Sequence, residues 1–463
     1  MRRAVLYARW ARSPVIFLLA PLAFSLVPLA QGADVAGDLI PRQMLMLSMK
    51  RAVELATSPE GNTNIQLQQE EVRQSKARSA EARAALLPNV QGYASQSSLI
   101  RSLASLGSES VKLPFNIHLP SAAGPYDVTD VRATASQSVF DFSALRRWQS
   151  ARKAVNATKA EQLHATNEVS ALVAKAYVAA LRADADVEAS NADVALAKAL
   201  LGQAQNEKNA GTGTGIEITR QKVKLADQTQ HLLEAQNERT KTHLQLLRAI
   251  GLRLDTEVEL TDKLAYIHEE PMTVEQAKEI AFKNRQDFLA QEDQENSSRL
   301  LASAAKWERL PTIQAWGDYG TIGQTDNAIL PTRDFGVTLK FPIFDGGRID
   351  ALRAEDASRY REEKIKSNDL RQQIELDVRT ALDSFHSAEE QVSVAQEGLE
   401  LADNELTQAR RRYSAGVTNG LEVTDAQTQL EHARDNQIAA FFNYNVARVD
   451  LGEATGTIRK LIQ

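Results

Sequence analysis

Cysteine is absent from the 463-residue chain, and its absence excludes several classes of protein. Without a thiol there is no disulfide, no thiolate metal site, no cysteine nucleophile and no acceptor for an N-terminal lipid anchor. Basic residues are not in excess, because 54 Lys and Arg stand against 60 Asp and Glu, and nothing suggests nucleic-acid binding. Beyond the N-terminus no apolar run is long enough for a transmembrane helix, and no Pro/Gly/Ser-rich linker divides the chain.

The N-terminus has the pattern of a secretory signal peptide. Several arginines come first, and an apolar run over residues 15–29 follows and ends in Ala-Gln-Gly. This order predicts a signal peptide over residues 1–32 with cleavage after Gly32. A membrane-anchoring helix is the alternative, but the run is short and two prolines interrupt it. We therefore expect an exported protein whose mature part, residues 33–463, is one domain.

Three pairs of segments recur in the same order in the two halves of the chain. The clearest pair is NAGTGTGIEIT at 209–219 and SAGVTNGLEVT at 414–424. The others are ALLPNVQGY (85–93) with ERLPTIQAW (308–316), and the Phe-Asp segments 140–153 and 344–357. The repetition predicts an internal duplication, with repeats at about 40–250 and 272–460.

Long helices are predicted between these motifs. Apolar and small residues recur at alternating spacings of four and three over residues 176–201 and again over 370–406. This is the seam of a coiled coil, whose side chains pack between those of a neighbouring helix. A helix from Asp345 to Tyr413 would be roughly 100 Å long at 1.5 Å per residue. Such a length suits a rod, a spacer or a tube better than a globular core.

Strand patterns precede each long helix. Phe335, Val337 and Leu339 alternate with polar residues and give one apolar face. With their neighbours, these segments predict β-hairpins at about 88–140 and 311–344, long enough to cross a membrane as tilted strands. Four strands cannot close a barrel, and lipid does not tolerate an open edge, so a membrane barrel requires strands from several copies. A soluble hairpin packed on a core is the alternative.

The sequence offers no catalytic, cofactor or metal site. Gly211, Gly213 and Gly215 have the spacing of a phosphate-binding loop, but they follow a helix and no Lys-Ser/Thr accompanies them. We interpret them as a helix C-cap and turn, where glycine accepts positive φ. The seven histidines have no metal-ligand spacing, and no nucleophile elbow is present. We expect a protein that is not an enzyme.

Two segments resemble a known family. FPIFDGGR (341–348) leads into the long helix of the second half, and YSAGVTNGLEVTDAQTQLEHAR (413–434) follows at its end. With the signal peptide and the duplication, they resemble the TolC-like outer membrane efflux proteins over nearly all of the mature chain. The resemblance implies a mainly α chain with a small β part. It also implies a homotrimer, with four strands per chain building a twelve-stranded barrel in outer-membrane lipid and the helices building a periplasmic tunnel.

The resemblance implies function and partners as well. The protein would be a passive duct of a tripartite efflux or type I secretion system, with no cofactor and no catalytic residue. Its partners would be a periplasmic adaptor and an inner-membrane transporter, of the resistance type or ATP-driven (ABC), and not nucleic acid. A periplasmic coiled-coil structural or adaptor protein without a pore is the alternative. An adaptor would also carry a compact lipoyl-like domain, and the sequence contains no segment that predicts one.

Site residues follow from the resemblance by position. The family's helical turns dock the adaptor at the periplasmic tip, and the matching residues here are Gly211, Gly215, Glu217, Gly416 and Gly420. Glu422 and Asp425 match the family's aperture carboxylates, and their spacing places them on one helix face. A solvated helix face is the alternative explanation for this pair.

Three further positions concern how the tip closes. Tyr413 matches a tyrosine near the family's latch. Thr418 stands where some members carry an arginine that links neighbouring helices, so that link is not expected here. In the first repeat Glu217 is retained, but Arg220 replaces the second acid.

FPIFDGGR itself is predicted to be the joint between strand and helix. Pro342 lies where strand pairing ends and a missing N–H is tolerated. Asp345 is a candidate N-cap, while Gly346 and Gly347 let the chain turn. The matching segment QSVFDFSA (137–144) lacks the proline and both glycines, so we expect the two joints to differ.

Overall fold

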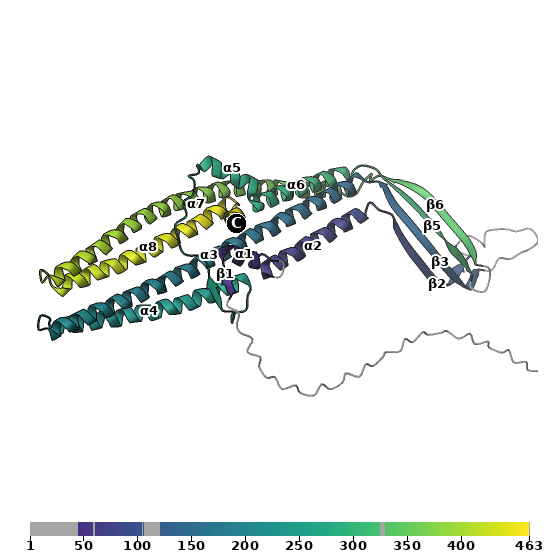
Figure 1. The fold of residues 1–463 in the computed structure, drawn as a ribbon. Helices are drawn as coiled ribbons and strands as arrows, with labels where there is room; N and C mark the ends of the chain where they lie inside the picture. Colours follow the sequence, from purple (N-terminus) through teal and green to yellow (C-terminus); the bar gives the residue numbers. More distant parts are fainter. Residues whose placement is uncertain (1–44, 59–60, 104, 106–120, 325–328, 463) are drawn as a thin grey trace, which may run out of the picture. The chain divides into compact units, whose positions relative to one another are not determined.

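The computed structural model describes residues 45–58, 61–103, 105, 121–324 and 329–462, so the predicted signal peptide lies outside the described residues. In chain order the elements are β1 (Leu45–Leu47), α1 (Met49–Ala56), α2 (Thr63–Ala84), β2 (Asn89–Ser102), β3 (Ala122–Phe140), α3 (Phe142–Asn209), α4 (Gly215–Ile250), β4 (Val258–Leu260), α5 (Val274–Asn284), α6 (Gln286–Trp307), β5 (Thr312–Gln324), β6 (Leu330–Lys340), α7 (Arg348–Ser414), α8 (Gly420–Ala454) and α9 (Ile458–Ile462) (Figure 1). The predicted chain, mainly α with a small β part, is confirmed.

The four long strands form one antiparallel sheet in the order β2-β3-β5-β6. The two hairpins join through β3 and β5, where Arg132 lies opposite Gly320 and Thr134 lies opposite Asp318. β2 and β6 are therefore edge strands, and in the part of the chain that the structure describes neither has a second neighbour. A sheet with two free edges is a template for pairing with another chain.

The two faces of this sheet differ in polarity. Phe335, Val337 and Leu339 of β6 alternate onto one face, and all three are exposed, Phe335 to 79%. On the other face the indole of Trp316 lies over Gly336 and donates from Nε1 to Thr338 Oγ1 at 3.0 Å. A single copy thus leaves the apolar face uncovered, which marks an interaction surface.

Two helices are far longer than the rest. α3 has 68 residues and α7 has 67, so each spans roughly 100 Å. The predicted seam of α7 is buried: Ile374 and Val378 pack with α5 and α6, and Phe385 packs with Tyr444 of α8. α3 packs against α2, α4, α6 and α8. The heptad-like spacing predicts one apolar stripe packed against neighbouring helices, and the structure shows that packing.

The second joint (residues 341–347) corrects one detail of the sequence analysis. α7 begins at Arg348 and its N-cap is Gly347, not Asp345. Two glycines with φ of 68° and 87° (Gly346 and Gly347) separate the aspartate from the helix. The Asp345 carboxylate still accepts bonds from Gly347 N at 3.1 Å and Ile349 N at 2.8 Å, so it satisfies helix donors from further upstream.

The first joint (residues 137–145) is simpler, as its sequence predicts. Asp141 is the N-cap of α3, and its carboxylate accepts a bond from Ala144 N at 2.9 Å. In both joints the Asp of a Phe-Asp pair thus accepts bonds from backbone N–H groups at the start of a long helix. Asp141 is itself the N-cap of α3, whereas Gly346 and Gly347 separate Asp345 from α7 and Gly347 is the N-cap.

Two glycines bring shorter helices end to end alongside α3. Gly251 follows α4 with φ of 85°, and a Cβ on it would be 2.0 Å from the carbonyl oxygen of Gly61, just before α2. Gly456 follows α8 with φ of 70° and approaches the backbone of Asn284 and Arg285, just before α6. α4 therefore abuts α2, and α8 abuts α6 (Figure 1).

Among the helices that the structure describes, none is both long enough and apolar enough to cross a membrane.

Candidate functional site

Each long helix turns back into a shorter helix, and three backbone hydrogen bonds recur in the two turns. In the first tip turn (residues 210–214), backbone N–H groups donate at 2.9 to 3.0 Å from Ala210 to Asn206, from Gly211 to Lys208 and from Thr212 to Glu207. In the second tip turn (residues 415–419) the equivalent bonds, at 3.0 to 3.1 Å, run from Ala415 to Arg411, from Gly416 to Tyr413 and from Val417 to Arg412. Gly211 and Gly416 have φ of 79° and 68°, which explains glycine at both places.

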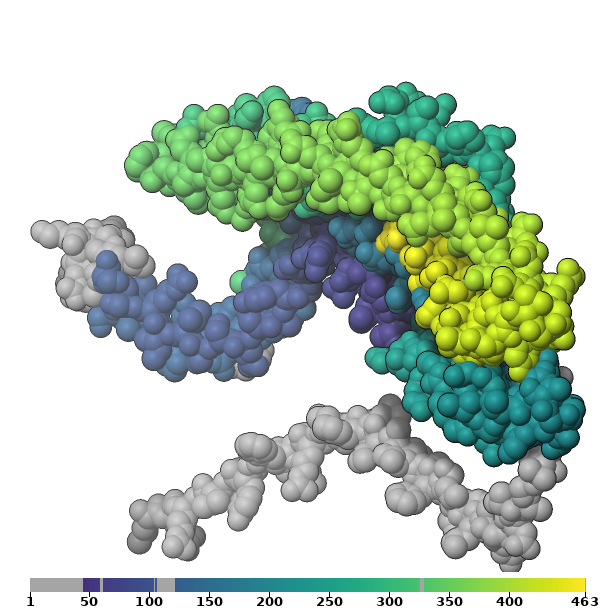
Figure 2. All heavy atoms as spheres, turned by 90° about the vertical axis from the view of Figure 1, so that its left-hand side faces the viewer, coloured from purple at the N-terminus to yellow at the C-terminus, as the bar shows by residue number. Residues whose placement is uncertain are grey.

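The two helical hairpins pack against each other near these turns. Leu200 of α3 belongs to one apolar cluster with Leu406 of α7 and with Val423 and Leu430 of α8. Figure 2 looks onto this end of the molecule and shows the α7/α8 hairpin (yellow) against the α3/α4 hairpin (teal). Apolar packing therefore aligns the polar residues that connect the two turns.

Tyr413 connects the last turns of the two long helices. Its hydroxyl donates to Oε2 of Glu207 at 2.5 Å. Burial raises the pKa of Tyr413 to about 12, and the negative charges of Glu207 and Glu217 add to the effect. The tyrosine is therefore protonated, and able to donate, throughout the physiological range.

Glu217 and Gly420 form a second connection, between α4 and α8. A Cβ at Gly420 would lie 2.4 Å from Oε2 of Glu217, so the glycine lets the carboxylate reach the first turn of α8. The positive end of a helix dipole favours a carboxylate at this place. Gly215 is under no such constraint, because its Cβ would meet only Lys208 Nζ, at 3.9 Å. Arg220 binds Glu217 at 2.7 Å within α4.

Glu422 is half-buried and tied to its own hairpin. Arg412 approaches its Oε1 at 3.3 Å, and the hydroxyl of Thr418 donates to its Oε2. Thr418 thus holds this carboxylate inside the second tip turn. Arg412 offsets the negative charge of Glu422.

Asp425 differs from Glu422, although the two are one helical turn apart. Its side chain is exposed, and within the described residues it has no ion pair or hydrogen bond. The predicted pair of carboxylates is therefore unequal: one is neutralised by a local partner and the other keeps a free charge.

Polar contacts between α4 and α8, next to the tip turns, were not predicted from the sequence. Lys224 of α4 binds Glu431 of α8 at 2.7 Å, and both side chains are largely buried. Gln221 donates to Thr424 at 3.4 Å between the same helices. Glu207 was not predicted as the partner of Tyr413 either. In each of these pairs the partners are about 200 residues apart, and no local sequence pattern marks them.

The part of the chain covered by the structure contains no cluster of His, Asp and Glu that could hold a metal ion. A sheet with an uncovered apolar face and two free edges, carried on helices roughly 100 Å long, is the arrangement expected of a subunit that contributes strands to a membrane channel. The model of the outer membrane efflux protein family matches residues 58–252 and 279–457, and the chain belongs to this family.

Relatives and solved structures agree with the assignment. The pyoverdine export outer membrane protein OpmQ of Pseudomonas putida is 24% identical over 391 residues, which cover 83% of this chain and 81% of that protein. The outer membrane protein VceC of Vibrio cholerae shares the fold with a TM-score of 0.73 and 17% identity, covering 88% of this chain and 96% of that one. The MtrE channel of Neisseria gonorrhoeae gives a TM-score of 0.71 at 18% identity, covering 89% of each chain.

These findings confirm the resemblance to TolC-like efflux channels and place the protein in the outer membrane. The family and the fold are those of channels and not of enzymes.

Proposed function

We propose that three copies of the chain form a passive outer-membrane duct of a tripartite efflux or type I secretion system. The observation that carries the proposal is the four-stranded sheet with an exposed apolar face and two free edges. An open edge is not tolerated in lipid, so β6 of one copy would pair with β2 of the next. Three copies would give a closed barrel of twelve strands.

The polar face of the sheet would then line the lumen of the barrel. Arg132 binds Asp130 at 2.7 Å and Asp318 at 3.4 Å on this face, so these three charged groups are paired across β3 and β5. A polar lumen and an apolar exterior are the two faces that a membrane barrel requires. The same faces argue against a pore-free periplasmic adaptor, which has no need of an uncovered apolar sheet.

The helices would form the periplasmic tunnel, and the tip turns its mouth. The three equivalent backbone hydrogen bonds of the two turns support an internal duplication. Gly211, Gly215 and Gly416 are exposed at or beside the turns, whereas Gly420 is buried against Glu217. A periplasmic adaptor would dock on this end of the two hairpins. A resistance-type or ABC transporter in the inner membrane would supply the cargo and determine its identity.

The contacts at the tip would keep the mouth closed and set its ion preference. The bond from Tyr413 to Glu207 holds the second hairpin to the first. Asp425 of three copies would place three free carboxylates around the opening, and such a ring favours cations. Glu422 contributes less to this ring, because Arg412 and Thr418 already engage it.

Fractionation tests the duct itself. We expect the protein in outer membranes as a trimer that resists SDS until heated, because paired strand edges and an apolar exterior are stable only in that assembly. The measurement is separation of inner membrane, outer membrane and periplasm, followed by gels of heated and unheated samples. A monomer recovered in the soluble periplasm would contradict the proposal.

An Asp425→Asn variant tests the ion preference. We expect the cation-over-anion permeability ratio to fall by a factor of about three or more, which corresponds to losing about one kT of local potential. Reversal potentials of purified channels in planar bilayers under a salt gradient measure the ratio. Glu422→Gln also removes one negative charge, but from a half-buried carboxylate that Arg412 and Thr418 hold inside the second tip turn, so it should change the ratio less.

The matched control for this experiment is Asp403→Asn, which removes an exposed aspartate from α7. Its permeability ratio should equal that of the unmodified channel. Equal ratios in the Asp425→Asn and Asp403→Asn channels would rule out the ring of carboxylates at Asp425.

A further inference from the structure

The second joint carries two large apolar side chains that its own chain leaves in the open. Ile343 is 88% exposed and Phe344 is 89% exposed. The backbone around them is nevertheless held in place, because Asp345 accepts bonds from Gly347 N and Ile349 N. Two adjacent apolar side chains on a fixed backbone mark a contact surface and not a random exposure.

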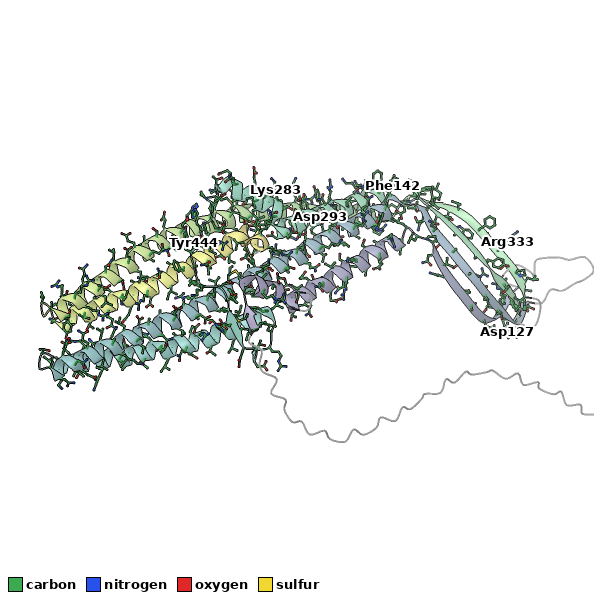
Figure 3. The ribbon with its side chains drawn as sticks, viewed as in Figure 1. Asp127, Phe142, Lys283, Asp293, Arg333 and Tyr444 are labelled. Atoms are coloured by element: carbon green, nitrogen blue, oxygen red, sulfur yellow. The ribbon has the colours of Figure 1, made fainter. Side chains whose placement is uncertain are left out.

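The first joint has the opposite shape. A cavity of about 410 Å³ lies there, lined on its apolar side by Leu86, Val139, Phe140, Phe142 and Leu145. The aromatic wall is well packed, since the rings of Phe140 and Phe142 meet edge to face with centroids 4.8 Å apart. Phe142 also packs on Trp307 at 5.4 Å. Figure 3 labels Phe142 where α3 meets the sheet.

The first joint, which has the cavity, and the second joint, which has the exposed Ile343 and Phe344, lie at the same end of the sheet. They lie on opposite flanks of it. β3 ends at Phe140, which lies opposite Ile313, and Lys340 at the end of β6 lies opposite Thr312. The cavity is built at the end of β3 and just before β2, one edge strand, whereas Phe344 follows β6, the other edge strand. In a closed ring with rotational symmetry, one flank of each copy faces the opposite flank of the next.

We propose that Ile343 and Phe344 of one copy fill the cavity at the first joint of the neighbouring copy and lock the ring where barrel and tunnel meet. The proposal rests on the trimer proposed above. The occupant is a second copy and not lipid, because the cavity is an aromatic-walled hollow beside the edge strand that must receive β6. The asymmetry of the joints has its reason here: the proline and glycines present only at the second joint aim its apolar side chains outward.

Cysteine cross-linking tests the contact, and the chain is suited to it because it has no cysteine of its own. A Phe344→Cys, Leu145→Cys double variant should form disulfides between copies, since they require Cβ atoms within about 4.5 Å. Non-reducing gels of oxidised outer membranes should show most of the protein as covalent dimers and trimers after boiling. A second double variant, Phe344→Cys with Leu86→Cys, tests contact with the same cavity independently.

The control pair is Ile365→Cys with Leu145→Cys. Ile365 is 68% exposed on α7, but it lies about 25 Å along the helix from the joint and should not cross-link. Phe344→Ala should lower the temperature at which the unboiled trimer dissociates by about 5 °C or more, and Phe344→Leu should restore part of that loss.

The outcomes separate the two proposals. Trimers that form normally but give no disulfide between copies with either pair would overturn the contact and leave lipid as the occupant of the joint. A disulfide formed only within one chain would overturn it too. Failure of the unmodified protein to form trimers would instead contradict the duct.

Discussion

A Tyr413→Phe channel is expected to open its periplasmic mouth more often than the unmodified channel. The substitution removes the hydroxyl that donates to Oε2 of the partly buried Glu207 carboxylate, which then keeps only the bond from Gln203 Nε2 to its Oε1. Losing one such bond costs about 1 to 2 kcal/mol, so the closed-to-open equilibrium should shift by about 5- to 30-fold. Single-channel recordings in planar bilayers would show a higher mean conductance, and cells carrying the variant would admit large polar antibiotics.

Tyr266→Phe is the matched control for this variant. Tyr266 also donates to a glutamate, Glu389, at 2.8 Å, but it lies away from the tip turns. Its loss should leave conductance unchanged. Combining Tyr413→Phe with Glu207→Gln should give less than the sum of the two single effects, because both remove the same bond. Full additivity, or equal conductance in the Tyr413→Phe and Tyr266→Phe channels, would remove this bond from the closure.

The pKa of Tyr413 fixes the pH range of the bond. Because its folded-state pKa is raised to about 12 from an ordinary value of 10, the contribution of the protonated form is fully present below pH 10. It is lost as the pH rises through about 12. Ionisation of Tyr413 therefore does not open the channel between pH 6 and 9.

A Gly251→Ala variant is expected to lose more stability than any other substitution discussed here. The left-handed backbone at φ of 85° costs an alanine about 1 to 2 kcal/mol. The new Cβ would also lie 2.0 Å from the carbonyl oxygen of Gly61, so backbone must move on one side. Together these effects should exceed about 3 kcal/mol. The yield of folded trimer and its thermal unfolding measure the loss.

A Gly202→Ala variant, in contrast, is expected to gain stability. Gly202 lies inside α3 with nothing within 4 Å of its Cβ position, so alanine should stabilise the helix by about 1 kcal/mol. If both variants unfolded at the temperature of the unmodified protein, the end-to-end contact of α4 with α2 would not be a determinant of stability.

Much of the fold could be predicted from local sequence. The seam of α7 is buried as its spacing predicts, because 3.5-residue periodicity places one stripe against a neighbour whatever that neighbour is. Gly211 and Gly416 could be recognised because the turn after a helix requires positive φ. The N-cap of α7 was predicted wrongly at Asp345, since Gly346 and Gly347 allow a conformation that other residues avoid.

The candidate site depends more on tertiary contacts than on local sequence. Glu422 and Asp425 look equivalent in the sequence, and the structure separates them by the position of Arg412 and Thr418. Arg412 lies ten residues before Glu422, across a turn whose shape decides whether the two meet. The spacing along α8 predicts which side chains share a helix face. It does not predict which of these side chains forms an ion pair with a residue at the end of the neighbouring helix.

By itself, the sequence determined the parts of this protein that depend on neighbours in the chain: long amphipathic helices, two matching turns, alternating strands and the membership of the efflux family. Only the tertiary structure decided the rest. It joined Tyr413 to Glu207 and Lys224 to Glu431, and it left Asp425 free and Phe344 exposed. The physical reason is that these contacts depend on how helices and strands pack at a distance, and packing is set by all of the surfaces together and not by any one segment.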